Sequence, residues 1–171
     1  MRFAIEEKIG HYNLKFLTEC FYTCLEEKEM YMLRYVIKGF KVGAKIKDVL
    51  TDNDVNILSK AHRHLERESH HFLGFVRFYR AGDVYVSKIE PKNSILPLIA
   101  SHFAQRFANQ QFMIYDAVHK QALISVNGNN FLLPRGKTST VPYYIAEEYR
   151  RSLKAQAIMD EHIDSMLGAS K

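Results

Sequence analysis

The sequence has little cysteine, proline and glycine: two, four and eight residues among 171. A chain of this length buries roughly two-thirds of its unfolded surface, so it needs no disulfide and no metal to fold. No apolar run approaches the ~18 residues of a membrane span. Residues 1–8 lack the apolar core of a signal peptide and include two acids. We therefore expect a cytoplasmic protein with no membrane partner.

The chain also lacks an internal repeat, a low-complexity tract and a linker rich in proline or serine, which indicates one domain over residues 1–171. Apolar spacing near 3.6 predicts helices over 13–27, 29–42, 46–50 and 52–72. Asn13 and Asp52 are the expected caps of the first and last of these. Met30, Leu33 and Ile37, followed by Phe40, are expected to face the core, and the second helix is expected to end near Gly43.

After residue 72 the apolar period changes to two, which is typical of strands. The pattern predicts strands at 75–80, 84–90, 112–115, 122–126 and 131–133, with a helix over 95–108. A loop over 134–140 and a charged helix over 143–167 follow. We therefore predict an α+β fold: an N-terminal helical block, a mainly antiparallel sheet in the order strand-strand-helix-strand-strand-strand, and a C-terminal helix.

The two cysteines, Cys20 and Cys24, are four residues apart, and on a helix they would share one face with Phe16, Leu17 and Phe21. This spacing favours two small buried residues. A metal site would need two more ligands at a recognisable spacing, and a redox pair would usually read Cys-x-x-Cys.

Glu68 occupies a position that the helical spacing reserves for an apolar residue. A carboxylate is costly to bury without a partner, so it must reach solvent, take a proton or pair with a cation. Arg77 is the candidate partner. The alternatives are a structural ion pair, a functional carboxylate with a raised pKa, and simple exposure on a helix whose phase differs from the predicted one. His64 and His71 lie on the same helical face and make a weak metal candidate with Glu68; a polar helix surface explains them more simply, and the sequence indicates no cofactor.

A basic stripe begins on the second predicted helix, and no acid interrupts residues 34–47. Such a row can follow a phosphate backbone, or it can be a solvated helix face. The candidate nucleic-acid-binding residues are Arg34, Lys38, Lys41, Lys45, Lys47, Arg63, Arg67 and Arg80.

No complete enzyme motif is present: the chain has no phosphate-binding glycine loop, no Gly-x-Ser-x-Gly elbow and no defensible Ser-His-Asp order. His102 and Arg106 lie four apart on a predicted helix, where a lone histidine is more often structural than an acid or base. Asp116 ends a strand, where aspartate also commonly starts a turn.

Five blocks in one order resemble an uncharacterised bacterial family labelled probable DNA metabolism protein. They are residues 33–43, 68–78, 89–93, 102–107 and 112–116, and the resemblance spans about residues 10–155. It implies association with a radical-SAM protein of DNA modification or repair, and some members are fused to a uracil-DNA glycosylase domain. The family pattern singles out Glu68, His70, Gly74, Arg77, Glu90, Pro91, His102, Arg106 and Asp116.

Three hypotheses follow. In the first, the chain is an accessory module that binds DNA or a radical-SAM partner. In the second, it is an enzyme acting on a nucleic-acid or phosphate-bearing substrate. Its candidate catalytic cluster is Glu68, His70, Arg77, Glu90, His102, Arg106 and Asp116. In the third, the chain is a protein-interaction scaffold in which these residues form a structural polar network.

Overall fold

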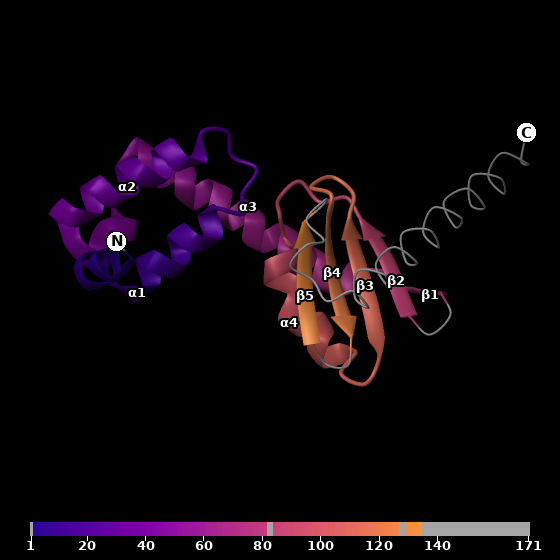
Figure 1. Ribbon diagram of the computed structural model, residues 1–171. Coiled ribbons are helices and arrows are strands. Elements are labelled where there is room, and N and C mark those ends of the chain that lie inside the picture. Colours follow the sequence, from indigo (N-terminus) through magenta and orange to yellow (C-terminus); the bar gives the residue numbers. More distant parts are fainter. Residues whose placement is uncertain (1, 82–83, 127–128, 135–171) are drawn as a thin grey trace, which may run out of the picture. The chain divides into compact units, whose positions relative to one another are not determined.

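The computed structural model describes residues 2–81, 84–126 and 129–134. It confirms the α+β class, with helices first and a sheet after them (Figure 1). The helix predicted at 143–167 and the loop predicted beyond residue 134 lie outside the described residues. The chain divides into two compact units, and the single domain over 1–171 stays a prediction. The first comprises Met1–His71 and Pro91–Ile95, and the second Phe72–Glu90 and Leu96–Lys171.

The first unit begins with α1, Arg2–Cys20, which is interrupted at Gly10, where φ is 83° and ψ is 157°. The prediction that Asn13 caps a helix over 13–27 is wrong, because Asn13 lies inside α1 and is buried. Its Nδ2 donates to the Ala44 carbonyl over 2.9 Å, and its Oδ1 accepts from the Tyr35 hydroxyl over 2.6 Å. Asn13 therefore ties α1 to the next two elements instead of starting a helix.

Helix α2 spans Lys28–Val42, as predicted, and Gly43 terminates it with φ 79°. The face predicted to be buried is wrong: Met30, Leu33, Ile37 and Phe40 are 47–53% exposed. Tyr35 and Gly39 are buried in their place. At Gly39 an added Cβ would lie 2.8 Å from Ile9 Cγ2, so the missing side chain lets α1 approach closely.

A 3-10 helix, η1 (Gly43–Asp48), leads to α3 (Asn53–Phe75), whose last four residues belong to the second unit. Asp52 caps α3 as predicted: its Oδ1 accepts from the backbone amides of Asp54 at 3.0 Å and Val55 at 3.3 Å. The core of this unit joins α1, α2, η1 and α3. Its buried members are Ile9, Phe16, Leu17, Cys20, Tyr35, Ile46, Val55 and Leu58.

The second unit holds a five-stranded sheet in the order β1-β2-β3-β4-β5. The strands are β1 Tyr79–Ala81, β2 Val84–Ile89, β3 Gln111–Asp116, β4 Gln121–Val126 and β5 Asn129–Pro134. Only β2 and β3 pair in parallel, with Val86 opposite Met113, and α4 (Leu96–Arg106) lies between them in the chain. The strand predicted at 75–80 is mostly absent, because α3 continues to Phe75.

An aromatic cluster fills the core of the second unit. Phe78 packs against Phe103, Phe107 and Phe112, with ring centroids 4.6–6.3 Å apart. Phe78, which is half-buried, thus packs against the core of this unit. None of the helices in the described part of the chain has the length and apolar character needed to cross a membrane.

Candidate functional site

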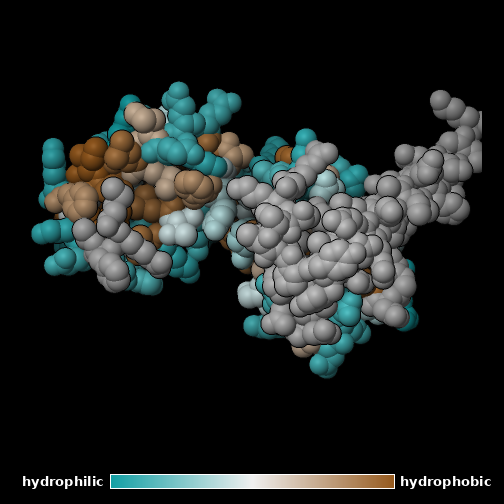
Figure 2. Space-filling model, viewed as in Figure 1, coloured by the Kyte–Doolittle hydropathy of each residue, from teal (hydrophilic) through white to brown (hydrophobic). Residues whose placement is uncertain are grey.

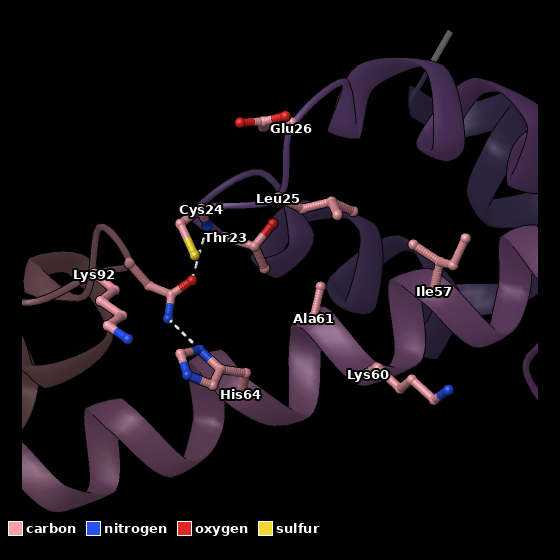
Figure 3. A pocket seen from close by; sticks show the side chains of 10 residues that line it. Thr23, Cys24, Leu25, Glu26, Ile57, Lys60, Ala61, His64 and Lys92 are labelled. Carbon is pink, nitrogen blue, oxygen red and sulfur yellow. Dashed lines mark hydrogen bonds between the residues drawn. The ribbon is translucent and has the colours of Figure 1, made fainter.

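A cavity of about 650 Å³ opens on the first unit, a size typical of ligand sites (Figure 3). Three segments form its wall: the turn after α1, one side of α3, and the segment Pro91–Ile95. The lining residues are Thr23, Cys24, Leu25, Glu26, Ile57, Lys60, Ala61, His64, Lys92 and Asn93. All of them belong to the same compact unit.

Asn93 joins the three segments and is only 1% exposed. Its Oδ1 accepts the backbone amide of Cys24 at 2.8 Å. Its Nδ2 donates to Glu68 Oε2 at 2.6 Å. The same nitrogen donates to His64 Nδ1 at 2.9 Å (Figure 3). Because an amide nitrogen can only donate, His64 accepts at Nδ1 and, when neutral, carries its proton on Nε2. Both polar atoms of the Asn93 side chain are thus engaged within the protein.

Glu68 binds the backbone of the segment that contains Asn93. Its Oε1 accepts the Lys92 amide and its Oε2 accepts the Asn93 amide, each at 2.8 Å. Arg77 was the expected partner, whereas the partners of Glu68 within the first unit are the Lys92 and Asn93 amides. Main-chain amides and one side-chain amide satisfy the carboxylate, as they do at a helix N-terminus. The arrangement anchors Pro91–Ile95 to α3.

The cavity has an apolar floor and a charged rim. Leu25, Ile57 and Ala61 supply the floor, while the side chains of Lys60 and Lys92 lie at the edge (Figure 3). His64 is exposed there as well. Glu26 is the one acid among the lining residues. The rim therefore favours an anion whose body is apolar.

The outer face of α3 beside this cavity carries three cations and two histidines. Lys60, Arg63, His64, Arg67 and His70 occur at i, i+3, i+4, i+7 and i+10, and all are exposed. We call these five residues the α3 basic face. It extends about 15 Å at 1.5 Å per residue.

The acids nearest the α3 basic face have other partners. Glu66 lies 3.5 Å from His62 Nδ1, and Glu68 is bound to the Lys92 and Asn93 amides. Their negative charge is therefore partly satisfied away from the face.

The basic stripe predicted on α2 is interrupted by acids from α3. Lys38 Nζ contacts Asp52 at 2.7 Å and Asp54 at 2.6 Å, and Arg34 lies 3.5 Å from Asp54. The pKa of Lys38 is raised by its hydrogen bonds to Asp52 and Asp54, and the pKa of Asp52 is lowered chiefly by the bond to Lys38. These two cations therefore stabilise the fold. The row of cations that remains for contact with a nucleic acid is shorter than predicted.

The remaining candidates for nucleic-acid contact are placed as follows. Lys41, Lys45 and Lys47 are exposed on α2 and η1, and Lys47 lies over the Tyr12 ring at 3.8 Å. Arg63 and Arg67 belong to the α3 basic face. Arg80 lies on β1 in the second unit, so it does not extend either row within the first.

The seven residues of the predicted catalytic cluster divide between the units. Glu68 and His70 belong to the first unit, and the second contains Arg77, Glu90, His102, Arg106 and Asp116. Within each unit, the described residues show no hydrogen bond or ion pair between two of the seven. The catalytic cluster therefore stays a prediction.

Each member of the cluster in the second unit has a local setting. Asp116 is fully buried at the end of β3; its Oδ1 accepts the amides of Val118 and His119, and its Oδ2 contacts His119 Nδ1 at 2.7 Å. It starts the turn into β4. His102 lies edge-on to the ring of Phe103, and Glu90 is 3.4 Å from Lys88. Arg77 and Arg106 are exposed.

The weak metal candidate is also explained by local contacts, because His64 Nδ1 and Glu68 both bind Asn93. His71 is exposed. A different group, Glu19, His62 and Glu66, places three potential ligand atoms within 4.8 Å of one another. In it the His62 ring bonds Glu19 through Nε2 at 2.6 Å and faces Glu66 through Nδ1.

The two cysteines differ, contrary to the prediction of a buried pair. Cys20 is buried at the end of α1, and burial raises the pKa of its thiol to about 12, with Glu19 adding to the effect. Cys24 is exposed and lines the cavity, because α1 ends at Cys20 and a turn follows. The prediction failed because it continued the helix to residue 27.

Sequence reasoning missed Asn93 and Lys92 as parts of a site. A signal was present: the run Glu90-Pro91-Lys92-Asn93-Ser94 breaks a strand pattern before a helix and belongs to a block of the family resemblance. The turn Thr23–Glu26 was missed because it was assigned to a helix.

Comparison with known proteins gives one match. The model of a family described as a domain of unknown function, DUF4130, matches residues 26–163. No curated protein and no solved structure matches the chain.

Proposed function

Since this chain belongs to the DUF4130 family, a domain of unknown function, its role must be inferred from its own surfaces, and we propose that it is an accessory module of DNA metabolism that binds nucleic acid through the α3 basic face. One observation carries the proposal: five exposed basic or histidine side chains line one face of one helix without an acid among them. Such a row exchanges condensed counterions for phosphate contacts when it meets a nucleic-acid backbone.

The dimensions of the α3 basic face suit this role. Its length of about 15 Å matches roughly four phosphate steps along one strand of duplex DNA. Arg63 and Arg67 supply planar donors that remain charged at every physiological pH. Lys92, at the rim of the adjacent cavity, adds a further cation to the same unit.

The α3 basic face supports nucleic-acid binding better than the basic stripe of α2 does. Arg34 and Lys38 would have to give up their contacts with Asp52 and Asp54 before they could meet a phosphate. The exposed arginines of α3 have no such requirement. The comparison set is Lys41, Lys45 and Lys47, which carry three positive charges, as do Lys60, Arg63 and Arg67 of the α3 basic face.

A paired-variant titration tests the proposal. The double variant Arg63→Gln/Arg67→Gln and the double variant Lys41→Gln/Lys45→Gln each remove two positive charges from exposed positions. We expect the first to weaken binding of a labelled DNA oligonucleotide about tenfold or more at ~0.1 M salt, and the second to weaken it less than threefold. Fluorescence anisotropy measures both.

The controls separate three outcomes. A greater loss of DNA affinity in the Lys41/Lys45 variant would assign the binding site to the basic stripe of α2. Equal losses would indicate attraction by net charge alone and would overturn the α3 assignment. Absence of binding by the unmodified chain would remove the nucleic-acid proposal altogether.

A second role, docking of a radical-SAM partner, is favoured by the exposed apolar stripe of α2. Met30, Leu33, Ile37 and Phe40 occur at i, i+3, i+7 and i+10, the spacing of a coiled-coil seam. Figure 2 shows apolar surface gathered on the helical unit over α2. Large exposed apolar patches of this kind mark interaction sites.

The charges beside the stripe indicate the chemistry of the docked element. Lys41 follows Ile37 by four positions and is exposed, so it lies where a coiled coil places a flanking charge. Arg34 holds the same position after Met30, but it already contacts Asp54 at 3.5 Å. The stripe therefore fits an amphipathic helix of the radical-SAM partner that carries acids beside its apolar face.

Substitution of the stripe tests this second role. Leu33→Asp/Ile37→Asp should abolish co-purification with the radical-SAM protein while leaving DNA affinity within a factor of two. Unchanged co-purification would exclude the apolar stripe of α2 as the docking site. The pair Glu7→Gln/Lys8→Gln, on exposed positions of α1, is the control.

A further inference from the structure

The cavity beside the α3 basic face has apolar lining residues that contacts with phosphates would not require. Its floor is apolar, formed by Leu25, Ile57 and Ala61, and it is about 650 Å³ in volume. Contacts with phosphates require cations and do not require an apolar floor. An open cavity with an apolar floor beside a basic face is suited to a flat, weakly polar group attached to an anion.

We propose that this cavity receives one unstacked nucleobase of a single strand whose phosphates lie on the α3 basic face. The inference rests on the proposed nucleic-acid function and specifies its substrate as a strand with a base free to leave the stack. Lys60 and His64 carry the connection, because both line the cavity and both belong to the α3 basic face. A nucleotide bound there would place its base on the floor and its phosphate at the rim.

The hydrogen-bonding state of the wall predicts how the base is recognised. Both donors of the Asn93 side chain are engaged by Glu68 and His64, its Oδ1 accepts from Cys24, and the residue is only 1% exposed, so it is not placed to read a base edge. The Thr23 hydroxyl donates to the Cys20 carbonyl at 2.7 Å. The charged and polar side-chain groups left for a ligand are at the rim: the Lys60 and Lys92 ammonium groups, His64 Nε2–H and the Glu26 carboxylate.

Recognition by an apolar floor is tolerant of base identity. Every base presents an apolar face that gains free energy when it leaves water, whereas only donors and acceptors placed at base edges distinguish one base from another. The site is therefore a holder of any accessible base. Duplex DNA, whose bases are stacked and paired, should use the α3 basic face alone.

The test compares two single strands that differ only in their bases. An oligodeoxythymidylate of about twelve nucleotides is titrated against an abasic deoxyribose-phosphate strand of the same length, by anisotropy with the full chain. We expect the thymidine strand to bind about tenfold more tightly, because only it can fill the cavity. Ala61→Phe fills the floor and should remove this preference while leaving affinity for the abasic strand unchanged.

A second measurement keeps the proposal testable if Ala61→Phe does not fold. Cys24 lines the cavity, so the thymidine strand should slow its reaction with a thiol reagent in the unmodified chain, and the abasic strand should not. Equal affinity for the two strands, or equal protection of Cys24 by both, overturns the base-holding cavity. Failure of both strands to bind would instead remove the nucleic-acid proposal on which the cavity rests.

Discussion

Asn93 and Glu68 are joined twice: the Asn93 side-chain amide donates to Glu68 Oε2 at 2.6 Å, and the Asn93 backbone amide donates to the same oxygen at 2.8 Å. This relationship explains why an acid occupies a position of α3 at which the helical spacing predicts an apolar residue. The carboxylate is the receptor for a segment that comes from between β2 and α4 and belongs to the first unit. By fixing that segment, the pair also forms one wall of the cavity.

Removal of the Asn93 side chain should destabilise the first unit. Asn93→Ala deletes the bonds to Cys24, His64 and Glu68, and leaves a carboxylate and a buried amide with fewer partners. We expect a loss of about 2–4 kcal/mol in the free energy of unfolding, since bonds to charged groups contribute about 1.5–3 kcal/mol each and are not additive. Urea denaturation measures it.

The control for this change is Asn109→Ala, on an exposed residue of the second unit, which should shift stability by less than about 0.5 kcal/mol. Equal effects of the two substitutions would show that Asn93 does not fix the segment.

The close approach of α1 and α2 predicts opposite effects for two glycine substitutions. Gly39→Ala would place a Cβ 2.8 Å from Ile9 Cγ2 and should destabilise the chain by about 1–3 kcal/mol through overpacking. Gly74→Ala meets nothing within 4 Å and should stabilise α3 by about 0.5–1 kcal/mol. Thermal unfolding of both variants compares them. Stabilisation by Gly39→Ala would contradict the buried face that we assign to α2.

The ion pair of Asp52 with Lys38 makes part of the stability depend on pH. The folded pKa of Asp52 is lowered chiefly by the hydrogen bond to Lys38. Its contribution is therefore complete above the ordinary aspartate pKa of about 4 and is lost as the pH falls through the folded value. Asp52→Asn should be less stable than the unmodified chain at pH 7, and the difference should shrink below pH ~4. A difference that grows with acid would contradict the ion pair.

The two cysteines should react at very different rates. Cys24 is exposed, whereas Cys20 is buried and its thiol pKa is raised to about 12, so it carries little thiolate at pH 8. A colorimetric thiol reagent should label one thiol quickly and the second only on unfolding. Cys24→Ser should remove the fast phase. A fast phase that survives this substitution would show that Cys20 is accessible.

Much of the fold follows from sequence periodicity. The bounds of α2, the cap at Asp52 and the β3–β4–β5 meander were predictable, because each depends on local spacing or turn chemistry. The buried face of α2 was not. Its stripe of Met30, Leu33, Ile37 and Phe40 is the more apolar one, yet the face with Tyr35 and Gly39 packs inward. That choice depends on a close approach to Ile9 and on a bond from Tyr35 to Asn13, which are both tertiary contacts.

The candidate site was only partly predictable for the same reason. Glu68 was identified because it breaks a helical pattern, which is a local signal. Its partner could not be identified, since Asn93 is 25 residues away and the bond uses backbone amides, which every residue possesses. The α3 basic face combines Arg63 and Arg67, which were predicted, with Lys60 and His64, whose position beside the cavity depends on the turn at Cys24.

The salt dependence of DNA binding tests the central claim most directly. If the α3 basic face holds phosphates, log affinity should fall linearly with log salt concentration, and Arg63→Gln/Arg67→Gln should make that slope shallower by about 1.5–2. Lys41→Gln/Lys45→Gln should leave the slope nearly unchanged. A slope in the Arg63/Arg67 variant equal to that of the unmodified chain would contradict the account.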